Sequence, residues 1–236
     1  MEAWWAALGL TALEGEALGL SLWVSFWAML GSLPPAVAVA WLLARRRFPG
    51  KTLVDGLVHL PLVLPPVVTG YLLLVVLGRR GVVGAWLHDR LGVTLAFTWK
   101  GAAVASAVLA FPLLVRAIRL SLEAVDQGLE QAARTLGAGR LRVFLTITLP
   151  LTLPGVLSGM VVAFARGLGE FGATITFVSN IPGQTRTLPL ALYSVLQVPG
   201  GEDAAMRLCV ISMVLALAAL LASELLSRRL AARMRG

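Results

Sequence analysis

The chain has 236 residues, of which 58% are hydrophobic and 14% are charged, and its mean hydropathy is +0.85. Soluble domains carry about 25% charged residues, so this composition excludes a soluble domain and predicts one domain embedded in a bilayer. The net charge of +8 comes from short basic clusters beside apolar stretches. Such clusters are typical of membrane topology signals and anionic-lipid contact, so no nucleic-acid partner is expected.

Residues that usually carry chemistry are few and isolated. Cys209 is the single cysteine and lies in an apolar run, and neither His59 nor His88 has a Cys or His partner at metal-ligand spacing. The segment Gly50-Lys51-Thr52 resembles the end of a phosphate-binding P-loop, but the first glycine of that motif would fall on Arg45. We therefore expect no metal site, no cofactor and no ATP binding in this chain, and no enzymatic activity of its own.

The hydropathy pattern predicts an all-α membrane protein. Residues 1–16 contain an apolar run too short to cross a membrane, and we expect them to form a periplasmic or interfacial segment. Residues 17–228 are then predicted to form the transmembrane domain, followed by a basic cytoplasmic tail at 229–236. Its five predicted spans cover residues 17–44, 56–78, 95–115, 152–178 and 206–226, with a long loop at 116–150.

Two of these spans contain residues that are unusual inside a membrane. Prolines interrupt the second span, where they either kink a packed helix or open the backbone toward a water-filled path. In the fourth span, Arg166 and Glu170 are four residues apart and can pair. This pair either fixes the helix bundle or places a guanidinium, whose fork matches oxyanions, along a translocation path. The candidate pathway residues are Pro65, Pro66, Thr69, Ser158, Arg166, Glu170, Gly172, Thr174 and Thr176.

The basic residues also predict an orientation. With five spans, 13 of the 20 basic residues fall on one side of the membrane, and that side includes the loop at 116–150. Positive charge is enriched in cytoplasmic loops, so the N-terminus is predicted outside and the C-terminus in the cytoplasm.

The long loop carries a predicted short helix. Asp126 suits its N-cap, and Gly137 suits the position after it, where a left-handed conformation favours glycine. Leu129, Ala132, Ala133 and Leu136 follow helical spacing and form an apolar stripe. Such a helix either rests on the membrane or contacts another protein.

The spacing of Glu130-Gln131-Ala132-Ala133, Gly137 and residues 147–150 (ITLP) resembles the EAA loop of ABC importer permeases. Residues 59–66 (HLPLVLPP) and 165–183 resemble the molybdate branch of that family. The resemblance implies a homodimer in the bacterial inner membrane, two copies of a cytoplasmic ABC ATPase and a periplasmic molybdate-binding protein. It implies that the loop helix is the coupling helix, with contact residues Leu129, Glu130, Ala132, Ala133, Arg134, Leu136, Gly137 and Arg140.

The leading hypothesis is therefore a permease subunit that translocates molybdate while a partner chain hydrolyses ATP. Sulfate, thiosulfate or tungstate permeases are alternatives within the same family. A stand-alone secondary anion carrier is an alternative from another class, but five spans do not divide into two inverted halves and the chain shows no internal repeat.

Overall fold

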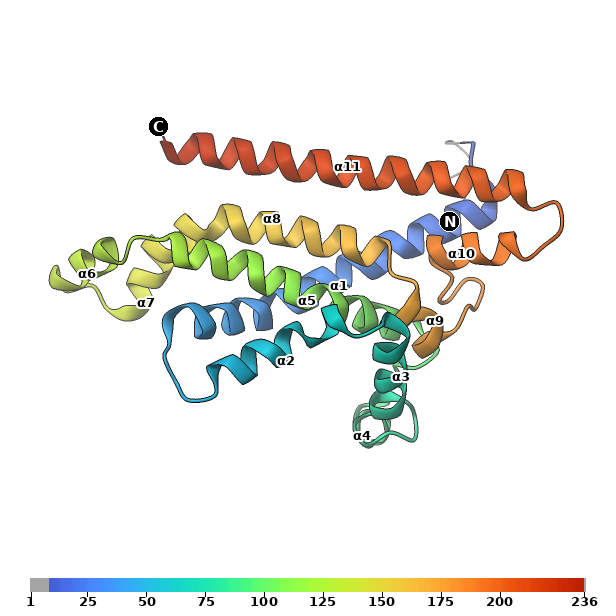
Figure 1. Ribbon diagram of the computed structural model, residues 1–236, viewed down its shortest axis with the longest axis horizontal. Helices are drawn as coiled ribbons and strands as arrows, with labels where there is room; N and C mark the ends of the chain where they lie inside the picture. The colour runs from blue at the N-terminus through green and yellow to red at the C-terminus, as the bar shows by residue number, and fades with distance from the viewer. Residues whose placement is uncertain (1–8, 236) are drawn as a thin grey trace.

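The computed structural model describes residues 9–235, which fold into helices without any strand (Figure 1). Four stretches are long and apolar enough to cross a membrane, and a sharply bent helix pair could form a fifth span. The four stretches are Ala12–Arg45, Trp99–Ala124, Arg140–Leu168 and Glu202–Ala222. The predicted all-helical membrane class is confirmed, with four or five spans.

The bundle is built around three long helices, α1 (Ala12–Arg45), α5 (Trp99–Ala124) and α8 (Leu149–Leu168), which pack on one another, while α11 (Glu202–Arg235) packs on α8. Small buried residues such as Ala36, Ala110 and Ala163 line these contacts. Without side-chain bulk, helix backbones approach closely, which is how helices associate in lipid.

Helix α1 begins five residues before the predicted first span. Thr11 caps it, and the carboxylate of Glu14 accepts the backbone N–H of Thr11 at 2.8 Å. Arg207 of α11 neutralises the same carboxylate at 2.8 Å. The prediction of a separate segment over residues 1–16 is therefore wrong from residue 12 onward, because a charge compensated by a distant partner does not end a helix. Residues 1–8 lie outside the described residues.

The second predicted span is broken. Helices α2 (Lys51–Val63) and α3 (Pro66–Leu77) meet at an angle of 113°. Leu64 and Pro65 adopt extended backbone conformations, as expected for residues that precede a proline. The predicted interruption at Pro65 and Pro66 is confirmed, and the predicted span over 56–78 corresponds to this sharply bent pair of helices. Helix α3 instead continues into α4 (Val82–Leu91), and the two form an arm that leaves the bundle (Figure 1).

The ends of other spans also differ from their predicted positions. The third span extends as α5 to Ala124, into the predicted loop. The fourth does not reach residue 178, because α8 ends at Leu168 and a separate helix, α9 (Gly172–Val178), follows. After the short α10 (Leu188–Leu196), the last helix α11 includes the predicted basic tail up to Arg235.

The arm is fixed to the bundle by a close crossing of α3 and α9. A Cβ atom on Gly70 would lie 2.6 Å from the carbonyl oxygen of Ala173, and one on Gly172 would lie 2.8 Å from Cβ of Pro66. Both glycines therefore allow a backbone approach that a larger residue would prevent.

We predict that Gly70→Ala destabilises the protein by about 1–3 kcal/mol, because the new methyl group must push α3 away from the α9 backbone. Thermal unfolding of the detergent-purified protein measures this loss. Gly31→Ala is the matched control, since Gly31 lies inside α1 with open space around it. An equal effect of the two substitutions would contradict the close crossing.

Candidate coupling site and pathway

The predicted loop helix exists and has the predicted ends. Helix α6 (Gln127–Thr135) begins after Asp126, whose side chain accepts the N–H of Gly128 at 2.7 Å. Gly137 has a φ of +85°, and its N–H bonds to the carbonyl of Arg134 at 3.0 Å. Two short segments, α7 (Arg140–Val143) and the π-helical η2 (Phe144–Thr148), then lead into α8. These elements lie together at one end of the molecule (Figure 1).

Glu130 faces into the protein. One carboxylate oxygen, Oε1, accepts hydrogen bonds from Nη2 of Arg45 and from Oγ1 of Thr148, both at 2.8 Å. The other oxygen lies 4.0 Å from Nη2 of Arg134, and the Glu130 side chain is only 12% exposed. We expected Glu130 on the contact surface, but the structure gives it a different position: it ties α6 to the end of α1 and to the end of η2.

The apolar stripe of α6 is open to its surroundings. Leu136 is 88% exposed and Leu129 is 50% exposed, while Ala132 is exposed and Ala133 is half-buried. Arg134, Gly137 and, on α7, Arg140 are exposed as well. Exposed leucines beside small residues on a polar helix suit contact with another protein.

The candidate pathway residues gather mainly where α3 crosses α9. Pro65, Pro66 and Thr69 lie at the start of α3, and Gly172 lies against Pro66. The hydroxyls of Thr174 and Thr176 donate to backbone carbonyls of α9 and its preceding residue, each at 2.8 Å. These two hydroxyls therefore support the short helix.

Ser158 is separated from this group. It lies on α8 ten residues before Leu168, which corresponds to about 15 Å along a helix.

Arg166 and Glu170 form the predicted pair, with Nη1 of Arg166 2.7 Å from Oε2 of Glu170. The carboxylate is 2% exposed, and its other oxygen accepts the N–H of Ala173 at 2.8 Å. Glu170 therefore bridges the break between α8 and α9 instead of joining two packed helices. Arg166 remains 31% exposed beside it.

Ion pairs between distant parts of the chain hold several of these helices together, and the sequence did not predict them. Arg119 of α5 contacts Asp55 of α2 at 3.0 Å and Glu123 at 2.8 Å. Arg45, one of the 13 basic residues on the predicted cytoplasmic side, also holds Glu130. No local pattern indicates partners that are 64 or 85 residues apart in the chain. Among the side chains that the structure describes, no cluster of three His, Cys, Asp or Glu residues could hold a metal.

Residues 36–236 match the sequence model of the family described as binding-protein-dependent transport system inner membrane component. The chain belongs to this family. It is thus a transport permease subunit rather than an enzyme, and the resemblance to ABC importer permeases is confirmed.

Molybdenum transport permeases are similar to nearly the whole chain, and a sulfate transport permease is similar to two thirds of it. The molybdenum transport system permease protein ModB of Escherichia coli (strain K12) is 65% identical over 219 residues, which are 93% of this chain and 96% of that protein. ModB of Haemophilus influenzae is 62% identical over 218 residues, or 92% and 95% of the two chains. The sulfate transport system permease protein CysT of Escherichia coli (strain K12) is 40% identical over 159 residues, or 67% and 57%.

Solved structures show the same fold. The bacterial ABC transporter involved in the import of the acidic polysaccharide alginate aligns with a TM-score of 0.74 at 19% identity, covering 95% of this chain and 82% of that chain. The inward-facing MetNI methionine ABC transporter aligns with a TM-score of 0.68 at 16% identity, covering 97% and 99%. The fold is therefore that of ABC importer permeases.

We predict that Glu130→Gln loosens α6 without unfolding the bundle, because it removes the charge that accepts hydrogen bonds from Arg45 and Thr148. Hydrogen bonds to a charged group contribute about 1.5–3 kcal/mol, so amide exchange across residues 127–135 should rise on the order of tenfold. Hydrogen–deuterium exchange measures this. Gln131→Ala is the control, since Gln131 is the exposed neighbour on the same helix. Unchanged exchange in Glu130→Gln would rule out the anchoring role.

Proposed function

We propose that this chain is the transmembrane subunit of an ABC importer that moves molybdate across the bacterial inner membrane. The observation that carries the proposal is the 65% identity to a molybdenum transport permease over 93% of the chain. The sulfate permease relative is less similar and covers less of the chain, so sulfate is the second candidate. Tungstate, an oxyanion of the same shape, remains an alternative substrate.

In this proposal the N-terminus lies outside and α6 lies in the cytoplasm. The helix ends near α6 carry Arg45, Arg46, Arg47 and Lys51, as the positive-inside rule requires. The end of α11 lies at the same end of the molecule as α6, whereas the start of α1 lies at the opposite end (Figure 1).

Two copies of a cytoplasmic ATPase would then dock on a homodimer of this chain, one on each α6. The exposed stripe of Leu129, Ala132 and Leu136 offers the contact, with Gly137 allowing close approach. The second permease copy would pack on α2. This helix exposes Leu53, Leu57 and Val63, and none of its residues is buried in the single chain.

A periplasmic binding protein would capture the oxyanion and deliver it to a path between the two permease copies. Along this path we place Arg166 and the polar residues at the α3–α9 crossing, where contacts must stay weak enough to release the anion. The ATPase drives the change between outward and inward access by moving α6, and rigid-body motions of packed helices are a known form of such transitions.

We predict that the double substitution Leu129→Ser and Leu136→Ser removes the ATPase from the purified complex, because it deletes the two largest apolar side chains of the docking stripe. Copurification of a tagged permease with its ATPase measures this. Leu145→Ser is the matched control, since Leu145 is 51% exposed on the neighbouring η2 and lies off the stripe. Retention of the ATPase by the double variant would refute the docking face.

The substrate is tested by ATPase activity of the reconstituted complex with its binding protein and molybdate, tungstate or sulfate. We expect molybdate to stimulate hydrolysis several-fold over the unloaded binding protein. Stimulation by sulfate but not by molybdate would overturn the substrate assignment. Transport without any ATPase would overturn the assignment to the ABC importers.

A further inference from the structure

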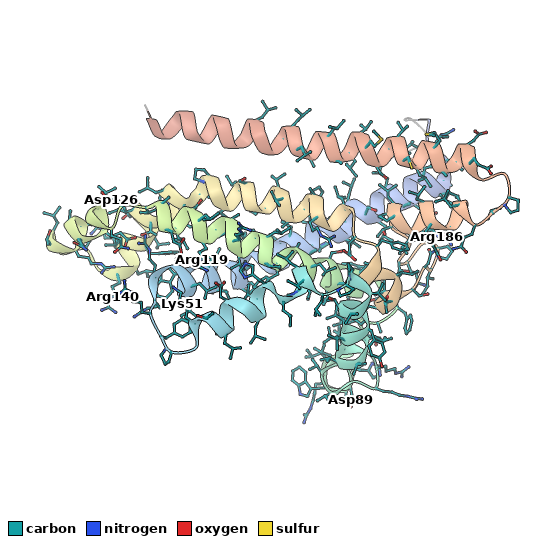
Figure 2. All side chains as sticks on the ribbon, in the orientation of Figure 1. Lys51, Asp89, Arg119, Asp126, Arg140 and Arg186 are labelled. Atoms are coloured by element: carbon teal, nitrogen blue, oxygen red, sulfur yellow. The ribbon has the colours of Figure 1, made fainter. Side chains whose placement is uncertain are left out.

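A large cleft opens at the α6 end of the molecule. It has a volume of about 1330 Å³ and lies between the end of α1, the start of α2, α6 and α7. Pockets for drug-sized ligands span about 300–1,000 Å³, so this cleft has room for something much larger than a tetrahedral oxyanion. Figure 2 shows two of its lining residues, Lys51 and Arg140, near each other at this end.

The polar side of the cleft is strongly basic. Six cationic side chains and one carboxylate line it, namely Arg45, Arg46, Arg47, Lys51, Arg134, Arg140 and Glu130. The carboxylate is already bonded to Arg45. The Nε atom of Arg45 is buried and has no hydrogen-bond partner among the described residues. Like charges held this close repel one another, so the cleft favours an anionic occupant.

The other side of the cleft is apolar and follows one face of α1. Pro34, Val37, Ala38 and Trp41 line it at helical spacing. From Pro34 to Arg45 the helix rises about 16 Å, which is close to half of the roughly 30 Å hydrocarbon core and hence to one leaflet. Trp41 lies at the junction, with the guanidinium of Arg46 5.2 Å from its ring centroid. Tryptophan and arginine together mark a membrane–water boundary.

We propose that this cleft binds one anionic phospholipid. Its phosphate would lie among Arg46, Arg47 and Lys51, and one acyl chain would follow the Pro34–Trp41 face. A free oxyanion would use the basic side but would gain nothing from the apolar side, which offers no hydrogen-bond donors. The lipid matches both sides of the cleft. With the proposed orientation, which this inference takes from the proposed function, the lipid belongs to the cytoplasmic leaflet.

The position of this lipid has a consequence for coupling. The cleft is walled on one side by α6, and Arg45 contributes both to the cleft and to the Glu130 anchor. A bound phosphate would offset the repulsion among the basic side chains around that anchor. We therefore expect anionic lipid to hold α6 in the position that the ATPase contacts.

The test uses the full-length permease reconstituted in phosphatidylcholine bilayers. One sample contains brominated phosphatidylglycerol and a second contains the same fraction of brominated phosphatidylcholine, and the bromine atoms quench nearby tryptophan fluorescence. We expect phosphatidylglycerol to be preferred over brominated phosphatidylcholine by at least about fivefold, given the attraction of several basic side chains to an anionic lipid. The variant R46Q/R47Q/K51Q should lose this preference. Trp41→Phe should lose it as well, leaving only the quenching of the other six tryptophans.

The matched control is R79Q/R80Q/R90Q, which removes the same charge from exposed positions on or beside α4, at the tip of the arm. An equal loss of preference in this control would overturn the site in favour of a general charge effect. Relief of quenching by millimolar inorganic phosphate or molybdate would overturn it in favour of a free-anion site. Wild-type protein without preference would also overturn it. Quenching needs no transport, so a wrong substrate assignment would leave this result unchanged.

Discussion

The arrangement of α6 and the helix ends around it depends on one carboxylate oxygen. Oε1 of Glu130 accepts hydrogen bonds from Arg45 at the end of α1 and from Thr148 at the end of η2. A hydrogen bond to an ionised group is short and strong, and this one is mostly shielded from water, so salt screens it little. Because one atom joins three segments, α6 cannot shift without shifting the ends of two long helices or breaking these bonds.

The opposite half of the molecule is organised by two broken helices that support each other. The break at Pro65 and Pro66 turns α3 away from α2, and the break after Leu168 separates α9 from α8. Irregular backbone at membrane depth requires internal partners for its polar groups. The α3–α9 crossing provides protein cover, and Glu170 provides an acceptor for the N–H of Ala173.

Features set by near neighbours could be predicted from the sequence. The Asp126 cap, the turn at Gly137 and the break at the proline pair each depend on a few adjacent residues, and each was predicted correctly. The inward position of Glu130 depends on Arg45, 85 residues away, and no local pattern encodes it. The spacing of Arg166 and Glu170 is equally compatible with an unbroken helix, so it could not reveal that Glu170 lies in the break before α9 and accepts the N–H of Ala173. The start of α1 was misplaced because Glu14 is neutralised from α11.

These two halves meet through α8. Its 20 residues correspond to about 30 Å, the thickness of a hydrocarbon core. At the N-terminal end of α8, Thr148 of η2 bonds to Glu130. At its C-terminal end, the pair of Arg166 and Glu170 connects it to α9. Each junction uses an arginine–glutamate pair to hold a short helix, so one continuous helix, α8, connects the α6 end of the molecule with the α3–α9 crossing. The π-helical turn of η2 stands directly before α8, and such turns are rare and frequently occur at functional sites.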